Sequence, residues 1–175
     1  MREIARAAGI SMGKLYTYYP TKEDLFTGLV ENMGRKMELI RQKEILPWMA
    51  SGDQESLRQL GMAIGRVVSR NLDYWRLMYV DVVEFRHKHF IRGFREVAGS
   101  LRKYSEALFQ ERPAPFPEGV DPGFAYFALY LQFFTYFLVE RLGARRHLGL
   151  SDEEAVARFV RLCTREREGS CQSEV

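Results

Sequence analysis

The 175-residue chain is 46% apolar and 28% charged, a composition that excludes a disordered chain and fits a folded globular protein. Its two cysteines have neither CxxC spacing nor neighbouring histidines, so we expect no disulfide framework or zinc site and a cytoplasmic location. The net charge is +3, and residues 1–22, with four basic side chains and one acidic, account for all of it. This basic end predicts a local contact with a polyanion, although cations on solvated helix faces give the same pattern.

Two short helices are predicted at the start of the chain. Residues 2–8 form the first, and Gly9 suits the left-handed turn that ends it. Ser11 caps the second, and Pro20 stops it. The side chains expected to face inward are Ile4, Ala5, Ala8, Leu15 and Tyr19.

The next two helices are long and amphipathic. Thr21 and Asp24 form a capping box at the start of the third helix, which is expected to end at Pro47. Residues 51–54 form the turn and cap of the fourth. Apolar side chains recur at steps of three and four residues, as an inward helix face requires: Phe26, Leu29, Met33, Met37 and Ile40, then Leu57, Leu60, Ile64, Val67 and Val68.

The second half of the chain repeats this pattern. An aromatic-rich helix is predicted over residues 74–90, and another continues to about Gln110 before a proline-rich loop over residues 112–122. The last two helices are expected over residues 122–147 and 151–164, each preceded by a capping residue. Since no segment shows strand alternation, the predicted fold class is all-α.

A membrane span has to be considered for residues 122–139, which carry no formal charge. The length is marginal, and tyrosine, glutamine and threonine side chains interrupt the apolar run. A helix that is apolar on nearly all sides is better explained by burial on two sides, so we expect no membrane association.

The first two helices match a helix-turn-helix pattern, in which the second helix enters the DNA major groove. With Leu15 and Tyr19 inward, the outward side of the second helix carries Met12, Lys14, Tyr16, Thr17 and Tyr18. Lys14 can donate to a guanine edge or a phosphate, and the tyrosine hydroxyls can donate to phosphates. Lys22 begins the third helix, where free backbone N–H groups and the helix dipole favour an anion.

The string REIARAAGISMGKLYTYYPTKEDLF, residues 2–26, resembles the DNA-binding signature of the TetR family of bacterial regulators. The run IA…AG.S.G.LY.Y followed by P.KE.L carries the resemblance, and the rest of the chain agrees only in architecture. The resemblance implies that Met12–Tyr18 is the recognition helix and that Gly13 keeps its backbone close to DNA. The positions where the family usually contacts DNA are Ser11, Lys14, Tyr16, Thr17, Tyr18 and Lys22.

The chain departs from the family pattern at its start. Family members carry a further helix before this motif, followed by a threonine that caps the next helix, and neither is present. We therefore expect a truncated and loosened DNA-binding head that binds DNA poorly on a body that folds and dimerises. The expected domains are the head with its connecting helix, residues 1–43, and an effector-binding and dimerisation domain, residues 44–175.

The resemblance further implies that the middle helices enclose an effector whose binding changes the separation of two DNA-binding heads. Abundant aromatic side chains are compatible with a small hydrophobic or aromatic effector, although each aromatic alone is ordinarily a core residue. Glu84, inside the apolar run VDVVEF, could orient a ligand or pair with a nearby arginine. The candidate effector-binding residues are Trp75, Met78, Tyr79, Glu84, Phe94, Phe127 and Phe134.

Residues 122–147 and 151–164 have apolar faces wider than one short neighbour could cover. Two copies are therefore expected to form a four-helix bundle across a two-fold axis, so that the protein is a homodimer. Two heads related by this symmetry would bind a near-palindromic operator in double-stranded DNA.

No constellation for catalysis is found, because the chain lacks a Ser/His/Asp set, a phosphate loop and paired carboxylates in an apolar context. His87 and His89 lie two residues apart on different sides of a helix, so we expect no metal site and no cofactor. The leading prediction is a ligand-responsive transcriptional repressor that the effector releases from DNA. The alternative is a helical small-molecule-binding protein that has lost DNA binding through the N-terminal truncation.

Overall fold

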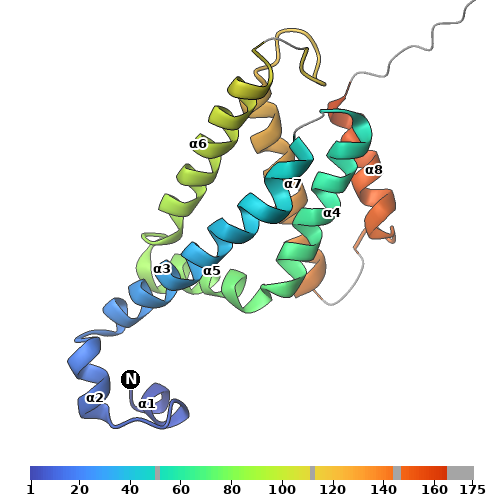
Figure 1. Ribbon diagram of the computed structural model, residues 1–175. Helices are drawn as coiled ribbons and strands as arrows, with labels where there is room; N and C mark the ends of the chain where they lie inside the picture. Colours follow the sequence, from blue (N-terminus) through green and yellow to red (C-terminus); the bar gives the residue numbers. More distant parts are fainter. Residues whose placement is uncertain (50–51, 111–112, 144–146, 165–175) are drawn as a thin grey trace, which may run out of the picture. The chain divides into compact units, whose positions relative to one another are not determined.

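A computed structural model gives the fold of the chain. It describes residues 1–49, 52–110, 113–143 and 147–164. These residues form eight α-helices and no strand, which confirms the all-α prediction (Figure 1). The chain divides into two compact units: Met1–Leu39 with Asp73–Phe94, and Ile40–Leu72 with the described residues from Arg95 onward. The functional boundary after residue 43 remains a prediction.

The first unit contains the short N-terminal helices and the parts of three longer ones. They are α1 (Arg2–Ala7), α2 (Met12–Tyr18), α3 (Lys22–Ile40), α5 (Leu72–Phe85) and the first turn of α6 (Phe90–Leu108). Ala5 is buried where α1 packs against α2. Ile4 is 41% exposed and Ala8 is also exposed, so the predicted inward placement of these two side chains is wrong. Helix α2 covers the side of α1 that carries Ala5.

The helix N-termini follow the predicted capping chemistry. Four capping side chains accept a hydrogen bond from the backbone N–H three residues further on: Ser11, Asp53, Asp121 and Ser151. Glu154 completes the capping box at the start of α8 by accepting from the N–H of Ser151 at 2.8 Å. These short-range bonds therefore fix where α2, α4, α7 and α8 begin.

The third helix ends differently from the prediction. The α-helical part of α3 stops at Ile40, and the chain continues as a π-helical turn, η1 (Arg41–Ile45), and a 3-10 turn, η2 (Leu46–Met49). Pro47 thus lies inside η2 rather than closing an α-helix. Because proline has no N–H and its ring clashes with the carbonyl four residues back, the α-helical bonding pattern cannot run through it. The wider turn η1 precedes this position.

The predicted helix over residues 74–90 is also wrong, because α5 ends at Phe85. Arg86 and His87 follow with φ angles of 55° and 60°, in the left-handed region that side chains disfavour. The carboxylate of Asp81 accepts the N–H groups of His89 and Phe90 at 3.0 and 2.9 Å, and so caps α6 from within α5. A buried tertiary contact, rather than glycine or proline, makes this turn.

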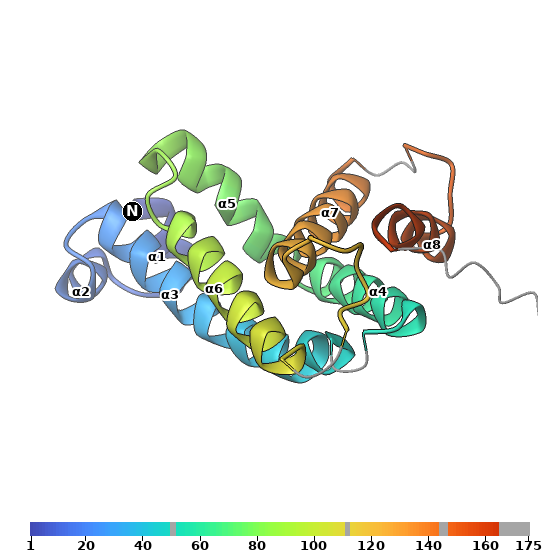
Figure 2. The same ribbon diagram turned by 90° about the horizontal axis from the view of Figure 1, so that it is seen from above.

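The second unit is built around α4 (Gln54–Arg70), which packs against α7 (Pro122–Leu142) and α8 (Asp152–Cys163) (Figure 2). It also contains most of α6. The predicted inward face of α4 is confirmed by the burial of Leu57, Leu60, Ile64, Val67 and Val68. On the same helix, Gly61 and Gly65 let the rings of Phe133 and Phe137 approach the backbone.

Helix α7 ends at Leu142 rather than near His147, and Gly143 follows as its C-cap. Residues 144–146 of the predicted helix lie outside the described residues. Among the described helices α7 is the one long and apolar enough to cross a membrane. Within the second unit it is the core helix, since Leu129, Phe133 and Phe137 are completely buried.

Candidate nucleic-acid interface

Helices α1 and α2 are joined by a tight turn built on Gly9, whose φ is 66°. The N–H of Gly9 donates to the carbonyl of Arg6 at 3.1 Å, and the N–H of Ile10 donates to that of Ala5 at 3.0 Å. These two bonds make a Schellman motif, which ends α1 and turns the chain. Ser11 follows at once as the N-cap of α2. The geometry is that of a helix-turn-helix.

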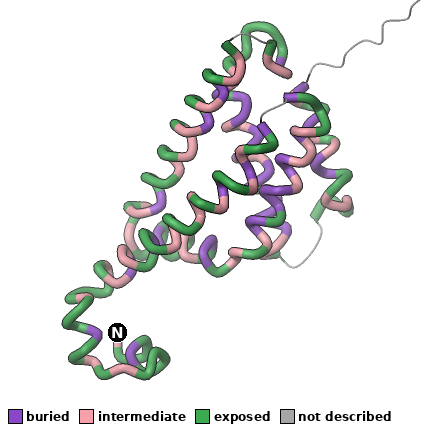
Figure 3. The backbone as a smooth tube through the Cα atoms, in the orientation of Figure 1, coloured by how far each residue is buried: buried purple, intermediate pink, exposed green. Residues whose placement is uncertain are grey.

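One side of α2 is buried and the other faces solvent (Figure 3). Leu15 is buried, as predicted, whereas Tyr16 and Tyr18 are 45% and 69% exposed. Gly13, Lys14 and Thr17 are exposed too, and Met12 is half-buried. The Thr17 hydroxyl donates to the carbonyl of Gly13 at 2.9 Å, which leaves its oxygen able to accept. The predicted DNA-binding residues of α2 are therefore exposed, apart from the half-buried Met12, and their contact with DNA remains a prediction.

Tyr19 fixes α2 on α3. This half-buried side chain follows α2 directly, and its ring lies against Gly28 of α3. The contact is close, because a Cβ atom at position 28 would lie 3.0 Å from Tyr19 Cε1. The ring thus holds the end of the exposed helix against the long helix that follows it.

The N-terminus of α3 carries the predicted capping box. Thr21 Oγ1 accepts from the N–H of Asp24, and Asp24 Oδ2 accepts from the N–H of Thr21, each at 3.0 Å. Lys22 is the first residue of α3, and its Nζ lies 3.1 Å from Oε2 of Glu84 in α5. Lys22 thus begins the third helix, as predicted, but it already has a carboxylate partner.

Further polar contacts hold the first turns of α3 to the turn between α5 and α6. Lys88 forms an ion pair with Glu23, and this carboxylate raises the pKa of the Lys88 ammonium group above its ordinary value. One turn further along α3, Thr27 Oγ1 lies 3.0 Å from His89 Nε2. Two contacts thus join residues that are more than 60 positions apart in the sequence.

Asp81 lies at the centre of this region and is completely buried. Its carboxylate accepts from the backbone N–H groups of His89 and Phe90, and its Oδ1 lies 2.7 Å from His89 Nδ1. Burial alone would raise the pKa of Asp81, but the hydrogen bonds from Phe90 and His89 outweigh it and hold that pKa below its ordinary value. The rings of Phe26 and Phe85 cover the imidazole edge-on. No local sequence pattern predicts this buried polar centre.

The seven predicted effector-binding residues are divided between the two compact units. Five belong to the first unit: Trp75, Met78, Tyr79, Glu84 and Phe94. Phe127 and Phe134 belong to the second. Trp75 and Phe134 are buried, Tyr79 and Glu84 are exposed, and the others are half-buried. Their role in ligand binding remains a prediction.

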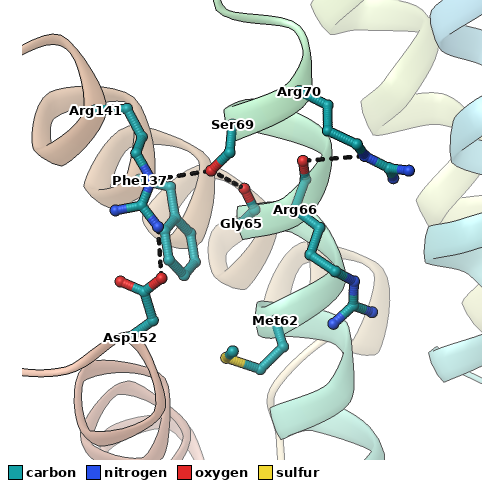
Figure 4. Close-up of a pocket in the computed structure, with 8 residues that line it drawn as sticks. All are labelled: Met62, Gly65, Arg66, Ser69, Arg70, Phe137, Arg141 and Asp152. Carbon is teal, nitrogen blue, oxygen red and sulfur yellow. Dashed lines mark hydrogen bonds and ion pairs between the residues drawn. The ribbon is translucent and has the colours of Figure 1, made fainter.

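A hollow of about 240 Å³ lies between α4, α7 and α8 of the second unit (Figure 4). It is lined by Met62, Gly65, Arg66, Ser69, Arg70, Phe137, Arg141 and Asp152, and by none of the seven predicted residues. Arg141 donates to Ser69 Oγ at 2.9 Å and to Asp152 Oδ2 at 2.5 Å, so it links the three helices. Figure 4 shows the three guanidinium groups pointing in different directions, which is not the geometry of a single anion site.

Comparison with known families agrees with this geometry. Residues 1–29 match the model of the family described as bacterial regulatory proteins, tetR family. No curated protein and no solved structure matches the chain. The matched segment contains α1, the Gly9 turn, α2 and the start of α3, which is the helix-turn-helix described above. The similarity to the tetR family of bacterial regulatory proteins therefore lies in this N-terminal segment.

Proposed function

We propose that the protein is a ligand-responsive transcriptional repressor that binds a palindromic operator as a homodimer in the cytoplasm. The observation that carries the proposal is the exposed side of α2, presented by a helix-turn-helix in the segment that matches the family. The exposed side chains there are donors and acceptors suited to phosphates and base edges, and no acidic residue lies on α2.

In this proposal α2 enters the major groove. Lys14 donates to a guanine edge or a phosphate, while Tyr16 and Tyr18 donate their hydroxyls to phosphates. Gly13 has open space where a side chain would begin, so the backbone of α2 can approach the DNA closely there. The Ser11 hydroxyl caps α2 by accepting from the N–H of Lys14. In the proposed complex, its position at the start of α2 puts it beside the DNA.

The second unit supports the proposed dimer. Phe124 and Val139 of α7 are exposed and lie fifteen residues apart, on one side of the helix together with Ala128 and Thr135. Leu162 of α8 is exposed as well. These apolar groups, outside the core that α7 and α8 share with α4, give a second copy a surface on which to pack.

Release from DNA is proposed to follow binding of a small hydrophobic or aromatic molecule. A ligand that binds better to one arrangement of the DNA-binding heads shifts the population toward it and lowers operator affinity by the difference in binding free energy. The half-buried side chains of Met78 and Phe94 in the first unit support an apolar ligand, because they combine apolar surface with partial access.

Fluorescence anisotropy tests the proposal. The protein is titrated onto short labelled duplexes taken from its own genomic surroundings, at several salt concentrations. Binding dominated by phosphate contacts should weaken with a log–log slope of about −0.9 per contacted phosphate. A dimer that binds none of the duplexes, or whose binding does not depend on salt concentration, would refute the proposal. That result would favour the alternative, a small-molecule-binding protein without DNA recognition.

A further inference from the structure

The Lys22–Glu84 ion pair lies at the edge of the proposed DNA-binding surface. Lys22 is one of the residues proposed to contact a phosphate, yet its Nζ lies 3.1 Å from the Glu84 carboxylate. We propose that Glu84 takes the place of a DNA phosphate at Lys22, so that DNA must displace it, and that Glu84 thereby limits DNA affinity. This inference rests on the proposed function and adds an intramolecular competitor to it.

A carboxylate is a suitable stand-in for a phosphate at this position. Both are anions with several acceptor oxygens, and an ammonium group binds either as a point charge. Lys22 is also the first residue of α3, where unbonded N–H groups and the helix dipole attract an anion. Glu84 therefore neutralises a place that would otherwise be available to the DNA backbone.

The position of Glu84 is set by the structure around it. Glu84 lies in the last turn of α5, next to Phe85, whose ring centroid is 4.6 Å from that of Phe26 in α3. The buried carboxylate of Asp81, one turn earlier in α5, is hydrogen-bonded to His89, which in turn contacts Thr27 of α3. These contacts keep the end of α5 beside the start of α3, so the carboxylate stays near Lys22.

The pair is also open to exchange. The side chains of Lys22 and Glu84 are 59% and 49% exposed, so a phosphate can reach the ammonium group from solvent. An ion pair this exposed is weak, and removing the competing carboxylate is expected to tighten DNA binding by about 2- to 5-fold per recognition helix.

The test is a double-mutant cycle on DNA affinity, with Glu84→Gln made in the native protein and in a Lys22→Met variant. The probe is a short duplex of mixed sequence, because binding to it reports sequence-independent phosphate contacts. Asp73→Asn is the matched control, since it removes one exposed carboxylate from the same helix, and its partner Arg76 lies outside the proposed DNA-binding surface. Thermal unfolding of each variant checks that the fold is retained.

Under the proposal, Glu84→Gln tightens binding in the native protein and has no effect once Lys22 is methionine, while Asp73→Asn changes little. An equal gain in both backgrounds would mean that Glu84 acts only through general repulsion of DNA, and it would overturn the inference. A Glu84→Gln variant with the DNA affinity of the native protein would also overturn the inference. If neither the native protein nor the variant binds any duplex, the proposed function itself fails.

Discussion

Asp81 and His89 form a buried pair in which Oδ1 of the carboxylate lies 2.7 Å from Nδ1 of the imidazole. The same carboxylate accepts the backbone N–H groups of His89 and Phe90, where α6 begins, and the same imidazole reaches Thr27 of α3. One charged group therefore stabilises a turn that contains two residues in the left-handed region, Arg86 and His87. Such residues persist only where the surrounding contacts enforce them.

Replacement of Asp81 by asparagine is expected to destabilise the protein by about 2–3 kcal/mol. The variant keeps the shape of the side chain but loses the charge, so the hydrogen bonds to the carboxylate weaken and an amide N–H₂ faces backbone donors. Urea unfolding followed by circular dichroism measures the loss. Asp73→Asn, at an exposed position of the same helix, should change stability by less than about 0.5 kcal/mol. Equal stability of the two variants would contradict the role given to Asp81.

The lowered pKa of Asp81 also predicts a pH dependence. Because its pKa is lower in the folded than in the unfolded chain, the carboxylate stabilises the fold above the unfolded value of about 3.9. That contribution is lost as the pH falls from about 4 through the folded pKa. Unfolding free energies measured from neutral to acid pH should fall more steeply for the native protein than for Asp81→Asn. Parallel curves would show that Asp81 does not supply the difference.

The glycines of α4 predict a contrast between two alanine substitutions. A Cβ at position 65 would lie 2.6 Å from the ring of Phe137, which is completely buried and cannot move aside freely. Gly65→Ala should therefore destabilise by about 1–2 kcal/mol, the strain exceeding the gain in helix propensity. At Gly99, in the middle of α6, a Cβ meets nothing within 4 Å. Gly99→Ala should stabilise by up to about 1 kcal/mol. Thermal and urea unfolding measure both, and the same sign for both would refute the packing argument.

A substitution on α2 tests the proposed DNA contact. Lys14→Met should weaken binding to duplex DNA and make the log–log salt slope less negative by about 0.9 for each recognition helix, the value for one phosphate contact. Its thermal stability should stay close to that of the native protein, because Lys14 is exposed. The matched control is Lys103→Met, an exposed lysine of α6 outside the proposed surface. If both variants keep the native slope, Lys14 makes no phosphate contact.

Much of the fold could be predicted because its determinants are local. A capping serine or aspartate binds an N–H three residues away, so Ser11, Asp53, Asp121 and Ser151 mark helix starts in the sequence itself. The core face of α4 follows from helical spacing alone. The end of α5 could not be predicted in this way, because Arg86 and His87 are held by a buried contact between distant side chains rather than by glycine or proline.

In the candidate site, too, local features could be predicted from the sequence and long-range contacts could not. The outward residues of α2 follow from the placement of Leu15 and from the family string, and their exposure agrees with this. The sequence indicates Glu84 as the acidic residue of α5 that could orient a ligand, yet the buried acidic residue of this helix is Asp81. Helical spacing explains the burial of Asp81, because it shares one side of α5 with Tyr74, Met78 and Phe85, whereas Glu84 lies off that side. The pairing of Glu84 with Lys22 spans 62 positions and has no local pattern.

The contact between Tyr19 and Gly28 makes the angle between α2 and α3 depend on the absence of a side chain at position 28. The phenol ring rests on bare backbone, and any larger residue at position 28 would push against it. Such a push would rotate the short helix slightly, and the side chains proposed to contact base pairs would shift along the DNA. The operator sequence that the protein prefers would then depend on position 28 of α3, a residue that contacts no base in the proposed complex.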